Sequence, residues 1–242
     1  MAYRRVPFAL DEWYHLYSRG IDKRPIFMDQ NDFKRFQALL YLANNTDPID
    51  FSAIKNIPYE VIFTTPRKQR LISIGAYSLM VNHPHLVVQE RRENGITAFM
   101  HKLGTAYTSY FNRKYERIGN LMVKPFRSKH ISDESYLRRV VQYVHLNVAE
   151  LFEHGWKNGD VRNIKTLEQK LLHYKFSSLP DYFGAHRLEQ NILDGEAKTL
   201  FSESLPHLSE VLHEAMLYYK EIEDEFTLRS RGYPKFRKAS PS

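Results

Sequence analysis

The 242-residue chain holds 35 lysine and arginine residues against 28 aspartate and glutamate residues, a formal net charge of +7. It has no cysteine, which excludes disulfides and thiolate metal sites. No apolar run reaches the roughly 18 residues of a transmembrane helix, and the first residues are charged where a signal peptide would be apolar. We therefore expect a cytoplasmic protein with one main domain, large enough to bury a substantial core.

The hydrophobic pattern predicts seven elements in chain order. These are strand 13–19, helix 30–44, strands 71–80 and 84–90, helix 96–116, strand 122–130 and helix 134–147. Such mixing predicts an α+β fold of ferredoxin-like type. The helices would cover one face of an antiparallel sheet, and the basic side chains of the last strand and the pair His83 and His85 would lie on the other. We predict a main domain over 1–180, with a Pro-rich insertion at 45–69. A helical appendage with a basic tail, 181–242, follows.

Two histidines one residue apart lie in the second strand of the expected hairpin. Alternate residues of a strand share a face, so His83 and His85 are expected to point the same way, with Pro84 between them. Two imidazoles on one rigid strand are a good start for a divalent cation site. An HxH pair in a chain with eleven histidines also arises by chance, so the pattern alone does not establish metal binding.

The last predicted helix contains a second chemical pair. Asp133 is a suitable N-cap, and Tyr143 and Asn147 are four residues apart, a spacing that places them on one helical face. A tyrosine hydroxyl and an amide oxygen would then project side by side. A tyrosine in an apolar helix stripe is otherwise usually a core residue with a hydrogen-bonded hydroxyl.

Five segments, in order and spanning roughly residues 13–184, together resemble the single-tyrosine HUH transposases, in particular the REP-associated tyrosine transposases. The segments are HLYSRGIDKRPIFMDQNDFKRF, AYSLMVNHPHLVV, YTSYFNRKYERIGNLMVKPFRS, YLRRVVQYVHLN and YKFSSLPDYFG. Three positions depart from the family pattern: Pro84 replaces a bulky apolar residue, Val81 stands where proline is common, and Val148 follows the expected ligand where family members often have proline.

The resemblance implies that His83 and His85 are paired metal ligands, that Asn147 supplies a further ligand and that Tyr143 is the nucleophile. The expected cofactor is Mg²⁺ or Mn²⁺, which would stabilise charge on the attacked phosphate. The expected product is a phosphotyrosine on the 5′ side of the cut with a free 3′ hydroxyl. Such covalent catalysis conserves the bond energy for rejoining, so no nucleotide cofactor is needed.

The distribution of charge indicates a nucleic-acid partner independently of the family resemblance. The stretch 101–147 holds nine lysine and arginine residues against three acidic residues. Basic residues can follow phosphates while aromatic faces stack on unpaired bases. Arg19, beside the Gly20 turn, is added as the resemblance suggests. The predicted DNA-binding residues are Arg19, Lys102, Arg113, Lys114, Arg117, Lys124, Arg127, Lys129, Arg138 and Arg139.

The sequence therefore predicts a metal-dependent endonuclease and strand transferase that acts on single-stranded, hairpin or palindromic DNA through Tyr143. One alternative is a catalytically silent DNA-binding regulator of the same fold, which would bind DNA equally well with phenylalanine at this position. A second is a metal hydrolase of another substrate that uses water as nucleophile. The sequence does not separate a monomer from a homodimer.

Overall fold

The computed structural model describes residues 7–50, 57–202, 205 and 207–217. Its first half holds strand β1 (Trp13–Tyr17), helices α1 (Gln30–Leu42) and α3 (Tyr59–Ile62), strands β2 (Ile72–Met80) and β3 (His83–Glu90), and helix α4 (Gly95–Lys114). Strand β4 (Arg127–Ile131) and helices α5 (Glu134–Leu146), α6 (Ile164–Leu172), α7 (Leu179–Tyr182) and α8 (Gly195–Ser202) follow. Short 3₁₀ turns occupy Ile21–Lys23, Asn147–Leu151, Trp156–Asn158 and Leu188–Ile192.

All seven predicted elements are present with the predicted type. The main difference is in the last strand, which begins at Arg127 instead of residue 122. Pro125 has no N–H to donate to a ladder, and Met122 makes only an isolated bridge to Gly20. The chain therefore joins the sheet only after this proline.

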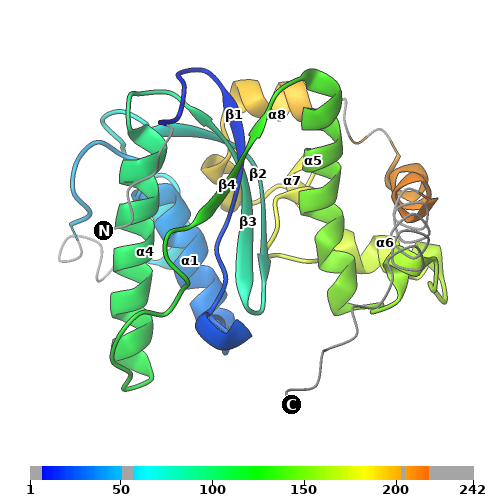
Figure 1. Ribbon diagram of the computed structural model, residues 1–242, viewed down its shortest axis with the longest axis horizontal. Coiled ribbons are helices and arrows are strands. Elements are labelled where there is room, and N and C mark those ends of the chain that lie inside the picture. The colour runs from blue at the N-terminus through cyan, green and yellow to red at the C-terminus, as the bar shows by residue number, and fades with distance from the viewer. Residues whose placement is uncertain (1–6, 51–56, 203–204, 206, 218–242) are drawn as a thin grey trace, which may run out of the picture.

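The four strands form one antiparallel sheet in the order β2-β3-β1-β4. This order, together with the sequence β1-α1-β2-β3-α4-β4, is the ferredoxin-like arrangement predicted from the sequence. Helices α1 and α4 cover one face, as predicted, and Figure 1 shows α5 on the opposite side of the sheet. The fold class is thus confirmed, with one correction: helix 134–147, predicted on the same face as the other helices, packs on the second face, where its apolar side is buried.

The two faces of the sheet support separate hydrophobic clusters. Tyr77 and Leu86 face α1 and α4, whereas Ala76 and Val87 face α5 and α8. All nine residues of β2 are buried, because this strand is covered on both sides. The apolar side of α5, which includes Val140, therefore needs a buried partner, and the sheet provides it.

Residues after 180 pack on both clusters. Ile192 and Leu193 join the α1 and α4 side, while Phe201 and Leu212 join the α5 side. The domain boundary at 180 and the insertion at 45–69 stay predictions, and the basic tail lies outside the described residues. Among the helices described, none has the length and apolarity needed to span a membrane.

Gly20 fixes the loop that supports the β2–β3 turn. Its N–H donates to the Asn82 carbonyl at 2.9 Å. A Cβ at this position would lie 2.1 Å from the Arg24 carbonyl oxygen, so the backbone would have to move. The turn before His83 therefore depends on a close approach that only glycine allows.

We expect Gly20→Ala to lower the free energy of unfolding by about 1–3 kcal/mol, because overpacking displaces the loop. The matched control is Gly104→Ala in the middle of α4, where the new Cβ meets no atom within 4 Å. That change removes a helix-interior glycine and should raise stability by about 0.5–1 kcal/mol. Urea unfolding of both variants checks the opposite signs; equal stabilities would refute the close-approach argument.

Lys114, predicted to bind DNA, joins α4 to the start of α1 in an ion pair. Its Nζ lies 2.7 Å from carboxylate oxygens of both Asp29 and Asp32, and the Asp32 side chain is completely buried. Burial raises the pKa of Asp32, but hydrogen bonds led by that from Lys114 outweigh it and leave the pKa below its ordinary value. Lys114 thus neutralises a buried carboxylate.

We expect Lys114→Met to destabilise the protein by about 3 kcal/mol at pH 7, since Asp32 would remain as an uncompensated buried charge. The neighbouring, exposed Arg113→Met should stay within about 0.5 kcal/mol of wild type. Because the folded pKa of Asp32 is lowered, its contribution is present above the ordinary value of about 4 and is lost as pH falls through the folded value. Denaturant unfolding at pH 7 and at acid pH measures the loss of stability and its pH dependence. Similar losses of unfolding free energy in the two variants would contradict the role of Lys114 in neutralising Asp32.

Candidate active site

His83 and His85 stand at the first and third positions of β3 and share the sheet face that looks towards α5. Their ring centroids are 4.7 Å apart. Pro84 does not break the strand. It pairs with Leu79, whose N–H donates away from β3 to the Phe176 carbonyl, so this is a pair without ladder hydrogen bonds. The nitrogen of Pro84 points towards β1. The position opposite it follows Tyr17, the last residue of β1, so no strand residue there needs an N–H from Pro84.

The side chain of Asn82 fixes the ring of His83. Its Nδ2 donates to the Lys23 carbonyl at 3.1 Å, which turns its Oδ1 towards His83 Nδ1 at 2.5 Å. An amide oxygen only accepts, so His83 Nδ1 carries the proton. In the neutral ring, Nε2 is then left with a free lone pair.

A third histidine, His15 on β1, was missed by the sequence reasoning. Its Nε2 lies 2.9 Å from His85 Nδ1, and the two rings stack with centroids 5.1 Å apart. Both side chains are buried, and His85 Nε2 has no hydrogen-bond partner. The available signal was the alternation of Trp13, His15 and Tyr17, which places all three on one face of an early strand.

All three histidines are neutral at physiological pH. Burial, reinforced by nearby positive charge, lowers the pKa of His15 and of His83 to about 4. Burial also lowers the pKa of His85 well below its ordinary value. The positive charges are Lys129 for His15, and Arg19 with Lys157 for His83. Neutral imidazole is the form that ligates metals.

Tyr143 extends from α5 over the same histidines. The helix begins after Asp133, whose side chain accepts from the Tyr136 N–H as the sequence predicts for an N-cap. The Tyr143 ring lies 5.6 Å from that of His85 and 5.8 Å from that of His15, both edge-on. Burial and the neighbouring Tyr17 raise its pKa, so its hydroxyl is protonated at neutral pH.

Asn147 ends α5 one helical turn after Tyr143, and its backbone N–H donates to the Tyr143 carbonyl. This confirms the predicted helical spacing. Its side chain is buried, at 5% exposure. Within the described part of the chain, no three His, Cys, Asp or Glu side chains are grouped as a metal site. A cation held by His83 and His85 would therefore need oxygen ligands from Asn147, water or substrate.

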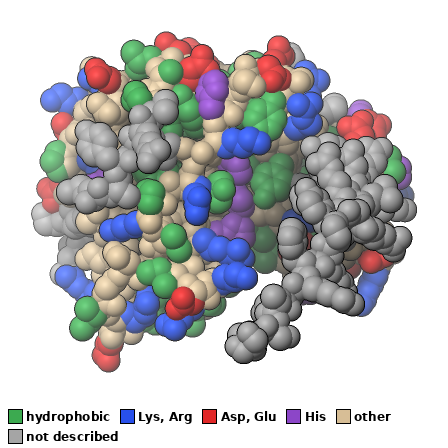
Figure 2. Space-filling view, viewed as in Figure 1, with side chains coloured by type: hydrophobic (Ala, Val, Ile, Leu, Met, Phe, Trp, Pro, Cys, Tyr) green, Lys and Arg blue, Asp and Glu red, His purple; other side chains and the backbone are tan. Residues whose placement is uncertain are grey.

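A cleft of about 630 Å³ lies beside His15, His85 and Tyr143. Figure 2 shows the molecule from the same side as Figure 1. Histidine side chains lie near the middle of the face in view, beside lysine, arginine and apolar side chains. The same cleft is also lined by Tyr17, Lys129, Tyr136, Arg139, Val140, Gln142, Leu146, Glu214 and Ala215. Of the ten predicted DNA-binding residues, Lys129 and Arg139 therefore line the cleft itself.

The remaining predicted DNA-binding residues are spread more widely. Arg127 is on β4 two residues before Lys129, and so on the same face. Arg138 lies 3.9 Å from Glu134 on the exposed side of α5. Lys102 is engaged within the protein, because its Nζ donates to the carbonyls of Asn45 and Asp47. These two contacts are 2.5 and 2.6 Å long. The end of α4 and the segment after it carry Arg113, Arg117 and Lys124.

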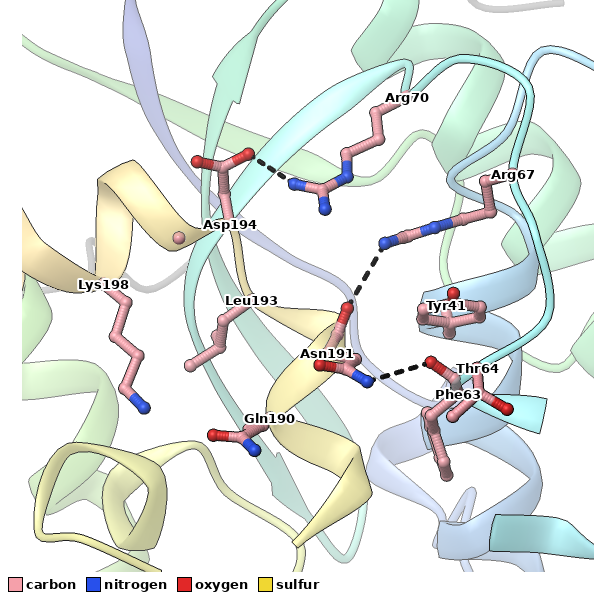
Figure 3. Close-up of a pocket in the computed structure, with 11 residues that line it drawn as sticks. Tyr41, Phe63, Thr64, Arg67, Arg70, Gln190, Asn191, Leu193, Asp194 and Lys198 are labelled. Carbon is pink, nitrogen blue, oxygen red and sulfur yellow. Dashed lines mark hydrogen bonds and ion pairs between the residues drawn. The ribbon is translucent and has the colours of Figure 1, made fainter. Parts of the chain in front are cut away.

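A second cavity, of about 480 Å³, contains none of the predicted site residues. Figure 3 shows Arg67 pointing towards Asn191 and Arg70 paired with Asp194. The Arg67 guanidinium lies over the Tyr41 ring, 3.8 Å from its centroid. These contacts tie the segment before β2 to residues 188–195.

Comparisons with known proteins find a likeness among solved structures. No protein-family model and no curated protein matches this chain. A solved structure described as a REP-associated tyrosine transposase bound to a REP hairpin aligns over 78% of this chain and 90% of its own. The aligned residues are 13% identical, with a TM-score of 0.45. At these values the likeness by itself assigns no function to this chain.

Proposed function

We propose that this protein is a metal-dependent DNA endonuclease and strand transferase that uses Tyr143 to attack single-stranded or hairpin DNA. The observation that carries the proposal is the approach of Tyr143 to buried, neutral histidines at the wall of a basic cleft. The motif order described above supports the same assignment.

The donor set fits a divalent cation. His83 presents Nε2 because Asn82 holds its Nδ1, and His85 Nε2 is a buried nitrogen without a partner. Two imidazoles with oxygen ligands suit Mn²⁺, and Mg²⁺ where phosphate oxygens complete the shell. When bound, the cation would neutralise charge on the phosphate and favour ionisation of a nearby phenol.

Tyr143 would act as the nucleophile. Its Oη loses a proton and forms a bond to phosphorus while the bond from phosphorus to the 3′ oxygen breaks, and that oxygen takes up a proton. The DNA is then joined through its 5′ phosphate to Tyr143, with a free 3′ hydroxyl. The phenol is neutral in the free protein, because its ordinary pKa of about 10 is raised further by burial. Its ionisation would therefore be coupled to assembly of the site.

Lys129 and Arg139 would hold the DNA backbone at the cleft. Both cations lie over the Tyr136 ring, Lys129 at 4.8 Å and Arg139 at 5.9 Å from its centroid. They approach the cleft from two different elements, β4 and α5. A phosphate bound between them would be within the positive field that already lowers the pKa of His15.

We expect the wild-type protein to form a covalent adduct with a labelled DNA hairpin in the presence of Mn²⁺ or Mg²⁺, and Tyr143→Phe to form none. Phenylalanine keeps the ring and loses only the attacking oxygen. The matched control is Tyr17→Phe, because Tyr17 lines the same cleft and lies 5.9 Å from His85. It should retain the adduct. Denaturing gels of the three proteins with the same DNA make the measurement.

The other outcomes separate the alternatives. Binding of hairpins without an adduct, across both metals and a range of DNA, would overturn the proposal in favour of a silent regulator. Cleavage that persists in Tyr143→Phe would instead indicate a hydrolase that uses water.

We expect the double variant Lys129→Ala/Arg139→Ala to bind single-stranded DNA more weakly. The slope of log affinity against log salt should fall by about 1.4, or roughly 0.7 for each lost phosphate contact. The charge-matched control is the double variant Arg91→Ala/Arg92→Ala. These two arginines come directly after β3, at the end of the strand opposite His83. Fluorescence anisotropy at several salt concentrations tests both variants. Equal slopes would remove the cleft from the DNA-binding surface.

A further inference from the structure

The contact between His15 and His85 has a direction that the resemblance and the comparison do not assign. Two ring nitrogens, His15 Nε2 and His85 Nδ1, face each other at 2.9 Å. At this distance the two nitrogens share a hydrogen bond, so one nitrogen carries a proton and the other accepts it. The direction of this bond decides which nitrogen of His85 is left free.

A histidine that ligates a metal is neutral and carries one ring proton. If His15 donated, that proton of His85 would sit on Nε2. That atom is buried and has no acceptor, and a buried donor without a partner costs about 1–3 kcal/mol. If His85 donates, its Nε2 carries a lone pair, which a cation can use. The second direction also gives His85 the tautomer that Asn82 imposes on His83.

The same contact engages His15 Nε2 with His85 Nδ1 at 2.9 Å, so this nitrogen is not free to act as a third ligand. This agrees with the lack of a three-residue metal cluster among the described residues. His15 therefore acts on the site through His85.

We propose that His15 is a positioning residue that accepts the Nδ1 proton of His85, and so holds His85 Nε2 unprotonated for a divalent cation. The cation part rests on the proposed function, whereas the tautomer part does not. Ligating histidines commonly donate their second N–H to such an acceptor, which fixes ring orientation and raises ligand basicity. The pairing register of β1 and β3 produces the contact. Tyr17 lies opposite His85, so His15, two residues before Tyr17, is a neighbour of His85 on the same face of the sheet.

The tautomer is measurable in the metal-free full-length protein labelled with ¹⁵N-histidine, through long-range ¹H–¹⁵N correlation of the His85 ring. We expect Nδ1–H in the wild type and Nε2–H in His15→Phe, which keeps a ring but has no acceptor. His15→Gln should restore Nδ1–H, since its Oε1 reaches the place of the lost Nε2. His15→Asn, which places its amide closer to the backbone, should not. Nε2–H in the wild type would overturn the proposal.

The second readout is affinity for Mn²⁺ alone, measured by electron paramagnetic resonance without DNA. His15→Phe should weaken binding by roughly 10–100-fold, and His15→Gln should recover most of it. Equal loss in both variants, with the tautomer unchanged, would contradict the positioning role. A wild type with Nδ1–H on His85 but no Mn²⁺ binding would keep the tautomer assignment and sink the metal-dependent function.

Unfolding measurements separate a loss of the positioning role of His15 from a loss of the folded structure. His15 is buried on a central strand, so all three variants are compared with wild type by denaturant unfolding. If His15→Phe is folded and still shows Nδ1–H on His85, the acceptor is another group and the proposal fails.

Discussion

The site depends on the antiparallel pairing of β1 with β3. This register sets Tyr17 opposite His85 and His15 opposite Val87, so that the two histidines are neighbours on one face of the sheet. A shift of one residue would turn every side chain of β1 to the other face. The α1 and α4 side holds Tyr14 and Leu16 in the main core, and their burial fixes the register that the histidines use.

Burial has two chemical effects at this site. It lowers the pKa of the imidazoles, which favours the neutral form that can ligate a metal, and it raises the pKa of the Tyr143 phenol. In the proposed mechanism, the cation supplies positive charge, and Lys129 and Arg139 bring the phosphate to it.

Much of the fold could be predicted from sequence, because periodic patterns define the strands and helices and the HxH spacing defines a shared face. Other features depend on contacts between distant segments. Nothing local indicates that His15 meets His85, 70 residues away, or that Lys114 neutralises the buried Asp32. Gly75 lies at a bulge where a Cβ would meet the Phe201 ring at 2.1 Å. That ring belongs to α8, in the segment predicted to be a separate appendage.

In the proposed mechanism, the hydroxyl oxygen of Tyr143 forms a covalent bond to the DNA phosphorus. The most direct measurement is mass spectrometry of the protease-digested reaction of the wild-type protein with a DNA hairpin and Mn²⁺. We expect a peptide containing Tyr143 that carries a nucleotide through its 5′ phosphate. A modified peptide that maps to another tyrosine, such as Tyr17 or Tyr136 in the same cleft, would contradict the assignment of the nucleophile.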